Sequence, residues 1–160
     1  MQKLTTFLSF VDRAEEAAEH YVSIFENSRI DRIIPWGELG PPGSKGTVLT
    51  VEFTLAGQAY VAMNGGAYFK MTDAVSISIA CKDQREIDET TAKLIAGGGE
   101  QRPCGWVRDR FGMHWQVVPA VLDEMRADPD PAKADRVMAA MMKMTKLDVA
   151  ALERAYAGEG

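Results

Sequence analysis

Histidine and cysteine are scarce in this chain of 160 residues, which contains two of each. The histidines are His20 and His114, and the cysteines are Cys81 and Cys104. With so few imidazoles and thiols, the sequence offers few candidates for a catalytic dyad or a histidine-based metal site. We expect the two thiols to be reduced rather than bridged, because cytosolic proteins keep their cysteines reduced.

Long apolar runs and basic clusters are also missing. No stretch approaches the roughly 20 apolar residues of a membrane-spanning helix, and the start at Met1 runs into a strand pattern without a signal peptide. The net charge is -5, and no run of Lys and Arg exceeds an isolated pair. Binding to nucleic acid needs many cations to neutralise phosphates. We therefore expect a cytoplasmic protein with neither a membrane nor a nucleic acid as its partner.

The sequence also lacks the glycine-rich loops that bind nucleotide cofactors. The three glycines 97–99 follow a predicted helix instead of linking a strand to one, which indicates a helix end rather than a phosphate loop. No predicted strand is followed by a Gly-x-Gly-x-x-Gly motif, so a Rossmann-type cofactor site has no support. We expect no cofactor.

What the sequence does contain is a pattern of strand, cap and helix that occurs twice, 71 residues apart. The first copy has a strand over 4–11 that ends at Asp12, which we predict to be the N-cap of a helix with a capping-box glutamate three residues later. The second copy has a strand over 75–81, and Asp83 occupies the equivalent capping position with the same glutamate spacing. Each copy therefore predicts an amphipathic helix after its first strand.

Each of these strands has one small or polar face and one face of Leu, Ile or Phe. The polar face begins at Thr5 in the first copy and at Ser76 in the second. Further strands over 29–36, 47–55 and 58–63 follow the first helix, with a hairpin turn between the last two. We therefore expect each sheet to offer one face to a helix and the other to a wetter surface.

The sequence thus predicts an α+β fold of two βαβββ modules, over about 1–66 and 74–119, that form a curved mixed sheet around a cavity. Residues 1–119 form the paired modules, and residues 120–160 form a C-terminal helical appendage. The glycine- and proline-rich segment 37–46 is either a mobile loop that overhangs the sheet or a plain surface connection.

A hairpin over 102–119 is the most informative stretch. Asp109 and Gly112 occupy the first and fourth positions of a predicted type I turn, where the carboxylate can bind local amides. In the strand that follows, Trp115 faces one way, whereas His114 and Gln116 face the other with two groups able to hydrogen-bond a ligand. We expect a binding site on that second face.

His114 and Cys104 are the two candidates for catalysis, and each has a structural alternative. His114 lies on the polar face, but a single histidine in a strand can equally be structural. Cys104 would need a neighbouring base or cation to act as a nucleophile, and is otherwise a buried, inert thiol. The methionines over 138–144 have helical spacing, which favours packing in a core or subunit interface over a soft-metal site.

Several segments together resemble one protein family: 17–25, 64–66, the hairpin strands over 103–119, and the tail 146–153. With the repeated βαβββ pattern, they are similar to the PhnB-like branch of the vicinal-oxygen-chelate superfamily. This superfamily includes glyoxalase I, bleomycin-resistance proteins and extradiol dioxygenases. Proteins of the branch often carry the label 3-demethylubiquinone-9 3-methyltransferase.

The resemblance implies a divalent metal held by four residues, typically His or Glu, from four strands. By position these residues are Thr5, Asn64, Ser76 and Gln116, and none of them is a histidine or a carboxylate. Neutral hydroxyl and amide oxygens bind first-row divalent ions weakly. We therefore expect no metal.

Two functions remain open at this point. The first is a metal-free protein that binds a small molecule in a cavity. The predicted lining of this cavity is Thr5, Phe7, Trp36, Asn64, Ser76, Ser78, Trp106, His114 and Gln116. The second is an enzyme of the same fold, either with His114 or Cys104 in acid–base or nucleophilic chemistry, or with methyl transfer as the branch label states. The resemblance also implies a homodimer, for which the methionine-rich helix offers an apolar surface.

Overall fold

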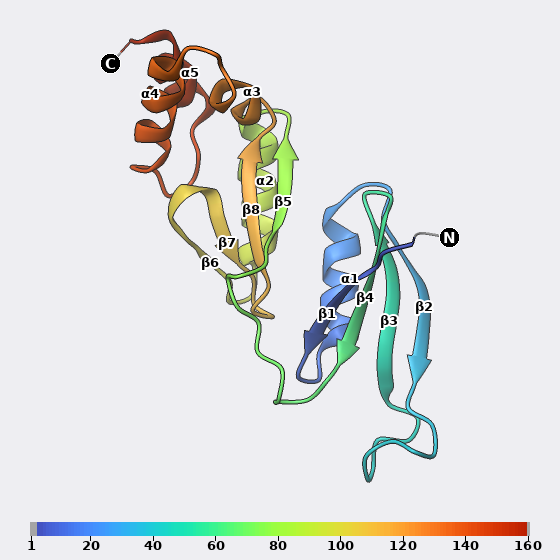
Figure 1. Ribbon diagram of the computed structural model, residues 1–160. Helices are drawn as coiled ribbons and strands as arrows, with labels where there is room; N and C mark the ends of the chain where they lie inside the picture. The colour runs from blue at the N-terminus through green and yellow to red at the C-terminus, as the bar shows by residue number, and fades with distance from the viewer. Residues whose placement is uncertain (1–2, 160) are drawn as a thin grey trace. The chain divides into compact units, whose positions relative to one another are not determined.

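The computed structural model describes residues 3–159, and the chain divides into two compact units, 1–71 and 72–160. Each unit contains one βαβββ module, and each module has its own four-stranded mixed sheet (Figure 1). Neither sheet closes into a barrel. The two modules predicted from the repeat are therefore present, and each is described by itself below.

The first unit has the strand order β1-β4-β3-β2, with β1 parallel to β4 and the other neighbours antiparallel. Apolar residues at helical spacing make α1 a helix that covers one face of this sheet, and Ala14, Ala17, Ala18 and Tyr21 are fully buried there. The other face is not covered by α1. The elements are β1 (Thr6–Phe10), α1 (Ala14–Ile24), β2 (Arg29–Pro35), β3 (Val48–Leu55) and β4 (Gln58–Asn64).

The prediction of Asp12 as the N-cap of α1 is wrong. The cap position is Arg13, which makes no side-chain capping hydrogen bond. Instead, the backbone N–H of Ala14 donates to Oδ1 of Asn64 at 2.8 Å, and Asn64 comes from the end of β4. An amide brought in by the sheet thus satisfies one of the open N–H groups of the helix start, and the nearby carboxylate is not used.

The second unit repeats the plan with the strand order β5-β8-β7-β6, in which β5 is parallel to β8. Here the predicted cap is confirmed, because the Asp83 side chain accepts from the backbone N–H of Glu86. The Glu86 carboxylate accepts from the N–H of Lys82 at 2.7 Å, one residue before the N-cap, whereas the predicted capping box would have used the N–H of Asp83. The module consists of β5 (Ile77–Cys81), α2 (Gln84–Ile95), β6 (Glu100–Gln101), the short 3-10 helix η1 (Pro103–Gly105), β7 (Trp106–Arg108) and β8 (His114–Pro119).

The turn between β7 and β8 is built around the Asp109 carboxylate, as predicted. Asp109 is 2 % exposed, and it accepts hydrogen bonds from the backbone N–H groups of Phe111 and Met113 and from Nε1 of Trp115. The glycines at the end of α2 have structural roles: Gly97 and Gly98 have positive φ, and a Cβ at Gly99 would lie 2.8 Å from the carbonyl oxygen of Arg108. They end a helix against β7, and they do not form a phosphate loop.

Three helices follow β8: α3 (Leu122–Arg126), α4 (Pro131–Met141) and α5 (Val149–Ala157). Their core is formed by Leu122, Met125, Val137, Leu147 and Leu152. The segment between α4 and α5 is tied to η1, because the N–H groups of Cys104 and Gly105 donate to the carbonyls of Met144 and Thr145, both at 2.8 Å. These helices therefore belong to the second compact unit; the treatment of 120–160 as a domain of its own stays a prediction. Among residues 3–159, no helix combines the length and apolar character that crossing a membrane requires.

Candidate functional site

The polar face of the second sheet brings together four of the predicted binding residues. Backbone pairing sets Gln116 beside Ser78 on one side and beside Trp106 on the other. Nε2 of Gln116 donates to Oγ of Ser76 at 2.8 Å. Ser78 is exposed and the other three are partly exposed. The alternation predicted for β8 therefore places these side chains on one face, while Trp115 and Val117 are buried against the other.

His114 lies next to this row but is itself buried, with 5 % of its surface exposed. Its Nδ1 is 3.5 Å from Nη1 of Arg102, and its ring meets Trp106 edge to face with 6.4 Å between the centroids. Because a guanidinium can only donate, a hydrogen bond at this contact requires Nδ1 to act as the acceptor. This imidazole is positioned as a packed, hydrogen-bonded group.

Arg102 is a neighbour of the polar face that the sequence interpretation did not include. It forms long contacts with Asp73 at 3.4 Å and with Glu100 at 3.8 Å. By contrast, Arg32 binds Glu52 with two short hydrogen bonds of 3.0 and 2.6 Å. No local pattern in the sequence connects Asp73 with Arg102, because the contact spans 29 positions.

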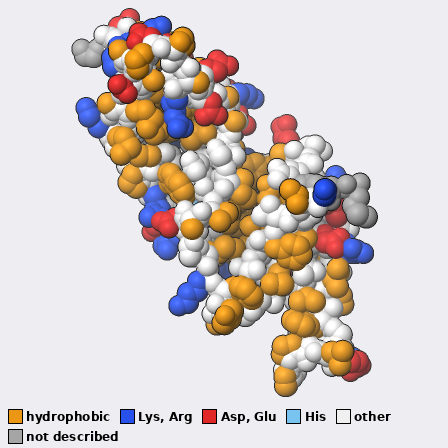
Figure 2. Space-filling model, in the orientation of Figure 1, with side chains coloured by type: hydrophobic (Ala, Val, Ile, Leu, Met, Phe, Trp, Pro, Cys, Tyr) orange, Lys and Arg blue, Asp and Glu red, His pale blue; other side chains and the backbone are white. Residues whose placement is uncertain are grey.

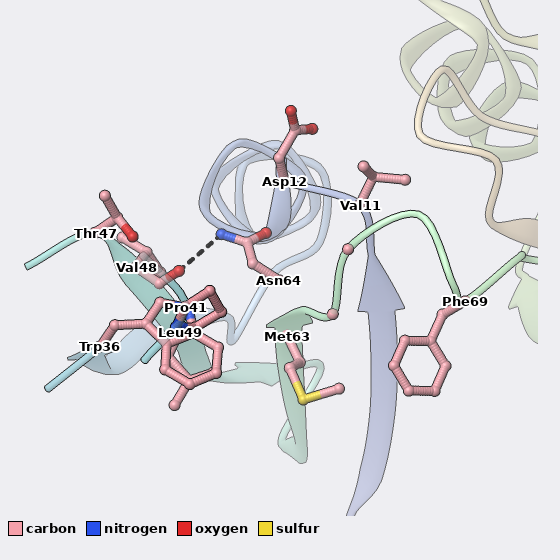
Figure 3. A pocket seen from close by; sticks show the side chains of 12 residues that line it. Val11, Asp12, Trp36, Pro41, Thr47, Val48, Leu49, Met63, Asn64 and Phe69 are labelled. Atoms are coloured by element: carbon pink, nitrogen blue, oxygen red, sulfur yellow. Dashed lines mark hydrogen bonds between the residues drawn. The ribbon is translucent and has the colours of Figure 1, made fainter. Parts of the chain in front are cut away.

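A cavity of about 660 Å³ lies in the first unit, where β1 and β4 end and the loop between β2 and β3 begins. Most of its lining is apolar and comes from Trp36, Pro41, Val48, Leu49, Met63 and Phe69 (Figure 3). Trp36 and Asn64 are the two predicted binding residues in the lining. Thr5 and Phe7 do not line this cavity; both are exposed, Phe7 on β1 and Thr5 immediately before that strand.

The loop 37–46 forms one side of this cavity through its contact with Trp36. The Trp36 backbone donates to the Thr47 carbonyl at 2.8 Å and accepts from the Gly46 N–H at 2.9 Å, so the two ends of the loop are held together. A Cβ at Gly40 would lie 2.9 Å from Cε3 of the Trp36 ring. The loop is thus folded back on the indole ring and holds it as a wall of the cavity.

Asn64 has a structural role in the first unit. Its Oδ1 binds the Ala14 N–H, and its Nδ2 donates to the Val48 carbonyl at 2.9 Å (Figure 3). Both ends of the amide are therefore occupied by the protein itself. The residue joins the start of α1 to the start of β3.

The four positions implied for a divalent metal do not fit a metal ion. Thr5 supplies a hydroxyl, Asn64 is committed to two backbone partners, and Ser76 and Gln116 bind each other. Nowhere in the part of the chain that the structure describes do three or more His, Cys, Asp or Glu side chains come together in a way that could hold a metal. Neutral oxygens that already have protein partners are poor ligands for transition ions.

The two cysteines lie in different environments. Cys81 is fully buried, and this burial, with the nearby Glu86 carboxylate, raises the pKa of its thiol to about 12. Cys104 is partly exposed and has a φ of 62°. Its Sγ lies 3.8 Å from Sδ of Met142. A thioether is not a base, so this contact does not activate Cys104 as a nucleophile.

We therefore predict that a disulfide reagent at neutral pH modifies one thiol of the folded protein, that of Cys104. Cys81 should react only after unfolding, because it is inaccessible and its raised pKa keeps it protonated. Mass spectrometry of the modified peptides identifies the site. Cys104→Ser should remove the fast reaction and Cys81→Ser should leave it, whereas a fast reaction of both thiols would contradict this assignment.

A family model and a solved structure that match this chain carry the same family label. The family model described as 3-demethylubiquinone-9 3-methyltransferase matches residues 2–118. A PhnB protein from Bacillus cereus, whose description carries the same methyltransferase label, is 37% identical over 74% of this chain and 100% of its own, with a TM-score of 0.66. No curated protein matches the chain.

Two further solved structures resemble the chain in fold. Protein PA1353 from Pseudomonas aeruginosa is 23% identical over 73% of this chain and 96% of its own, with a TM-score of 0.60. The fosfomycin resistance protein FosX from Listeria monocytogenes is 19% identical over 78% of this chain and 97% of its own, with a TM-score of 0.52. At these identities the likeness concerns the fold alone.

Proposed function

This chain belongs to the 3-demethylubiquinone-9 3-methyltransferase family, the PhnB-like branch of the vicinal-oxygen-chelate superfamily, and within it we propose a metal-free protein that binds a small molecule. The observation that carries this proposal is the chemistry of the four positions at which superfamily enzymes hold their metal. All four are neutral here, and three of them already bond to other groups of the protein. The fold is that of the glyoxalase and bleomycin-resistance proteins, and none of these four positions carries a histidine or a carboxylate.

Two surfaces support binding. The cavity of the first unit, at about 660 Å³, falls within the roughly 300–1,000 Å³ range of small-molecule sites. In the second unit, the row of Ser78, Gln116 and Trp106 combines hydrogen-bonding groups with an aromatic side chain. Apolar walls with a few polar groups are typical of ligand sites.

An enzymatic function with His114 or Cys104 is the alternative. His114 is buried against Arg102 and Trp106, and Cys104 faces a thioether. Methyl transfer from an adenosine-containing donor would need a recognisable nucleotide loop, and the glycines 97–99 form a helix end instead. These contacts favour binding over catalysis.

A thermal-shift screen of small molecules, followed by recovery of each hit, tests the proposed function. We expect at least one compound to raise the melting temperature and to be recovered unchanged, because a ligand that binds the folded state stabilises it. If a hit is instead converted to product, and conversion stops in His114→Ala or Cys104→Ala, the enzymatic alternative is correct.

We predict that the purified protein contains no stoichiometric divalent metal. The reason is that one buried imidazole among neutral oxygens falls short of the three or so strong ligands of a catalytic metal site. Elemental analysis after dialysis is the measurement. About one equivalent of zinc, nickel, iron or manganese per chain, lost in Gln116→Ala, would contradict both this prediction and the proposed function.

We also propose that the protein is a homodimer with a cytoplasmic location. The methionine-rich segment contributes less exposed surface than expected, since Met141 and Met144 pack on the helical core; Met142, by contrast, is 66% exposed. The first unit offers more: Phe7 and Leu39, among other large apolar side chains, are exposed at its surface, and Figure 2 shows hydrophobic side chains on the projecting loop between β2 and β3. Exposed apolar surface of this kind is typical of interfaces.

Light scattering at micromolar concentration should therefore give the mass of two chains. Leu39→Ser on the loop and Phe7→Ser on β1 should each shift the mass toward that of one chain if their surfaces are buried in the dimer. Glu153→Gln, on the exposed side of α5, is the matched surface control. A monomer in the unchanged protein would end this proposal.

A further inference from the structure

We propose that the cavity of the first unit takes a cationic amphiphile, a small molecule with a compact apolar body and one positively charged head group. This inference rests on the proposed function as a binding protein and adds a location and a ligand class to it. It follows from which groups of the lining already have partners and which do not.

The inner part of the cavity suits an apolar body. In Figure 3, Trp36, Pro41 and Leu49 lie together on one side of Met63, and Phe69 lies on the other. Met63 lies on the sheet face that α1 does not cover. Successive side chains of a strand point to opposite faces, and its neighbour Ala62 is fully buried on the other face. An aromatic ring or a branched alkyl group placed here would exchange water for contacts with these side chains.

The polar groups of the lining leave no obvious place for an anion. Nδ2 of Asn64 already donates to the Val48 carbonyl, and Oγ1 of Thr47 donates to the Ser44 carbonyl at 2.6 Å. The backbone N–H groups of Gly65 and Gly66 are likewise bonded, to the carbonyls of Phe10 and Val11. A carboxylate or phosphate needs several free donors, and these four are committed.

Asp12 is the one charged residue among the described residues that line the cavity. Its carboxylate is exposed at the start of α1, and because Asn64 provides the acceptor for the helix N–H, the expected capping role does not occupy it. Within residues 3–159, no hydrogen bond or ion pair to this carboxylate is formed. An unpaired carboxylate at the rim of an apolar cavity attracts a ligand with a cationic head and an apolar body.

Three probes with one aromatic body and different charge test this inference: naphthylmethylamine, naphthylmethanol and naphthylacetate. Each is titrated into the full chain at low salt and followed by two-dimensional amide NMR, which gives both the affinity and the location. The amine should bind about three- to fivefold more tightly than the alcohol, the range expected for an exposed charge pair. The acetate should bind most weakly, and the largest shifts should occur at Trp36 and Met63.

The decisive variant is Asp12→Asn, which keeps the shape of the side chain and removes its charge. Because Asp12 neither caps α1 nor bonds to another residue, the fold should be unaffected. The variant should bind the amine as weakly as the alcohol and leave the alcohol unchanged. Glu19→Gln, an exposed charge on α1 outside the cavity, should leave the affinity for all three probes unchanged.

Two results would overturn the inference while leaving the proposed function in place. One is equal or tighter binding of the acetate, or a preference for the amine that survives in Asp12→Asn. The other is that none of the probes binds, or that the shifts occur on the sheet of the second unit. The thermal-shift screen covers the whole chain and every charge class, so its outcome decides the proposed function separately.

Discussion

Replacing Asp109 with alanine should lower the free energy of unfolding by about 3–5 kcal/mol, the largest effect that we expect from a single substitution. The carboxylate binds two backbone N–H groups and Nε1 of Trp115 in an environment where Asp109 is 2 % exposed. Without it, the N–H groups of Met113 and of the fully buried Trp115 ring lose these hydrogen bonds while they stay shielded from water. Urea denaturation followed by far-ultraviolet circular dichroism measures the change.

Two comparisons separate the hydrogen bonds from a general effect of losing an aspartate. Asp130→Ala removes an exposed N-cap that bonds to the Ala132 N–H, and should cost only about 1 kcal/mol. In a double-mutant cycle, Trp115→Phe should make the Asp109→Ala change less costly, because the indole N–H that bonds to Asp109 is then absent. Equal costs for Asp109→Ala and Asp130→Ala would show that the turn does not depend on the carboxylate.

Asn64→Ala should lower the free energy of unfolding by about 2 kcal/mol, the second largest effect. One part, about 1 kcal/mol, is the loss of an acceptor at the start of a helix. The rest is the unpaired Val48 carbonyl, at about 1 kcal/mol for a partly buried group. The same denaturation measurement applies, and because Asn64 lies in the first unit, a loss of α1 helicity should accompany it.

The matched variant is Asp12→Ala, which removes the residue that the sequence suggested as the cap. Since Arg13 occupies the cap position and Asn64 supplies the hydrogen bond, this change should stay within about 0.5 kcal/mol of the parent protein. Asn64→Asp keeps the acceptor and loses the donor, so its cost should fall between the two. If Asp12→Ala costs more than Asn64→Ala, the capping role assigned to Asn64 is incorrect.

Features that depend on neighbours in the sequence were predictable. The Asp83 cap with its glutamate, the Asp109 turn and the alternation of His114, Trp115 and Gln116 each involve residues within a few positions of one another. Turn chemistry, capping and strand alternation act at this short range. The family resemblance extended the same local patterns to the whole chain, and the match over residues 2–118 confirmed it.

The sequence by itself determined the two βαβββ modules and, in the second module, the helix cap and the hairpin turn. It also determined that none of the four superfamily positions carries a histidine or a carboxylate. Only the tertiary structure decided how the polar groups are used. Asn64 binds the helix start 50 residues away, and Gln116 binds Ser76 across 40 positions. Such contacts depend on which strands become neighbours, and a pattern with a period of two or 3.6 residues contains no information about that choice. For this reason the sequence assigned Asp12 to the helix cap, whereas the folded chain leaves its carboxylate free at the rim of a cavity.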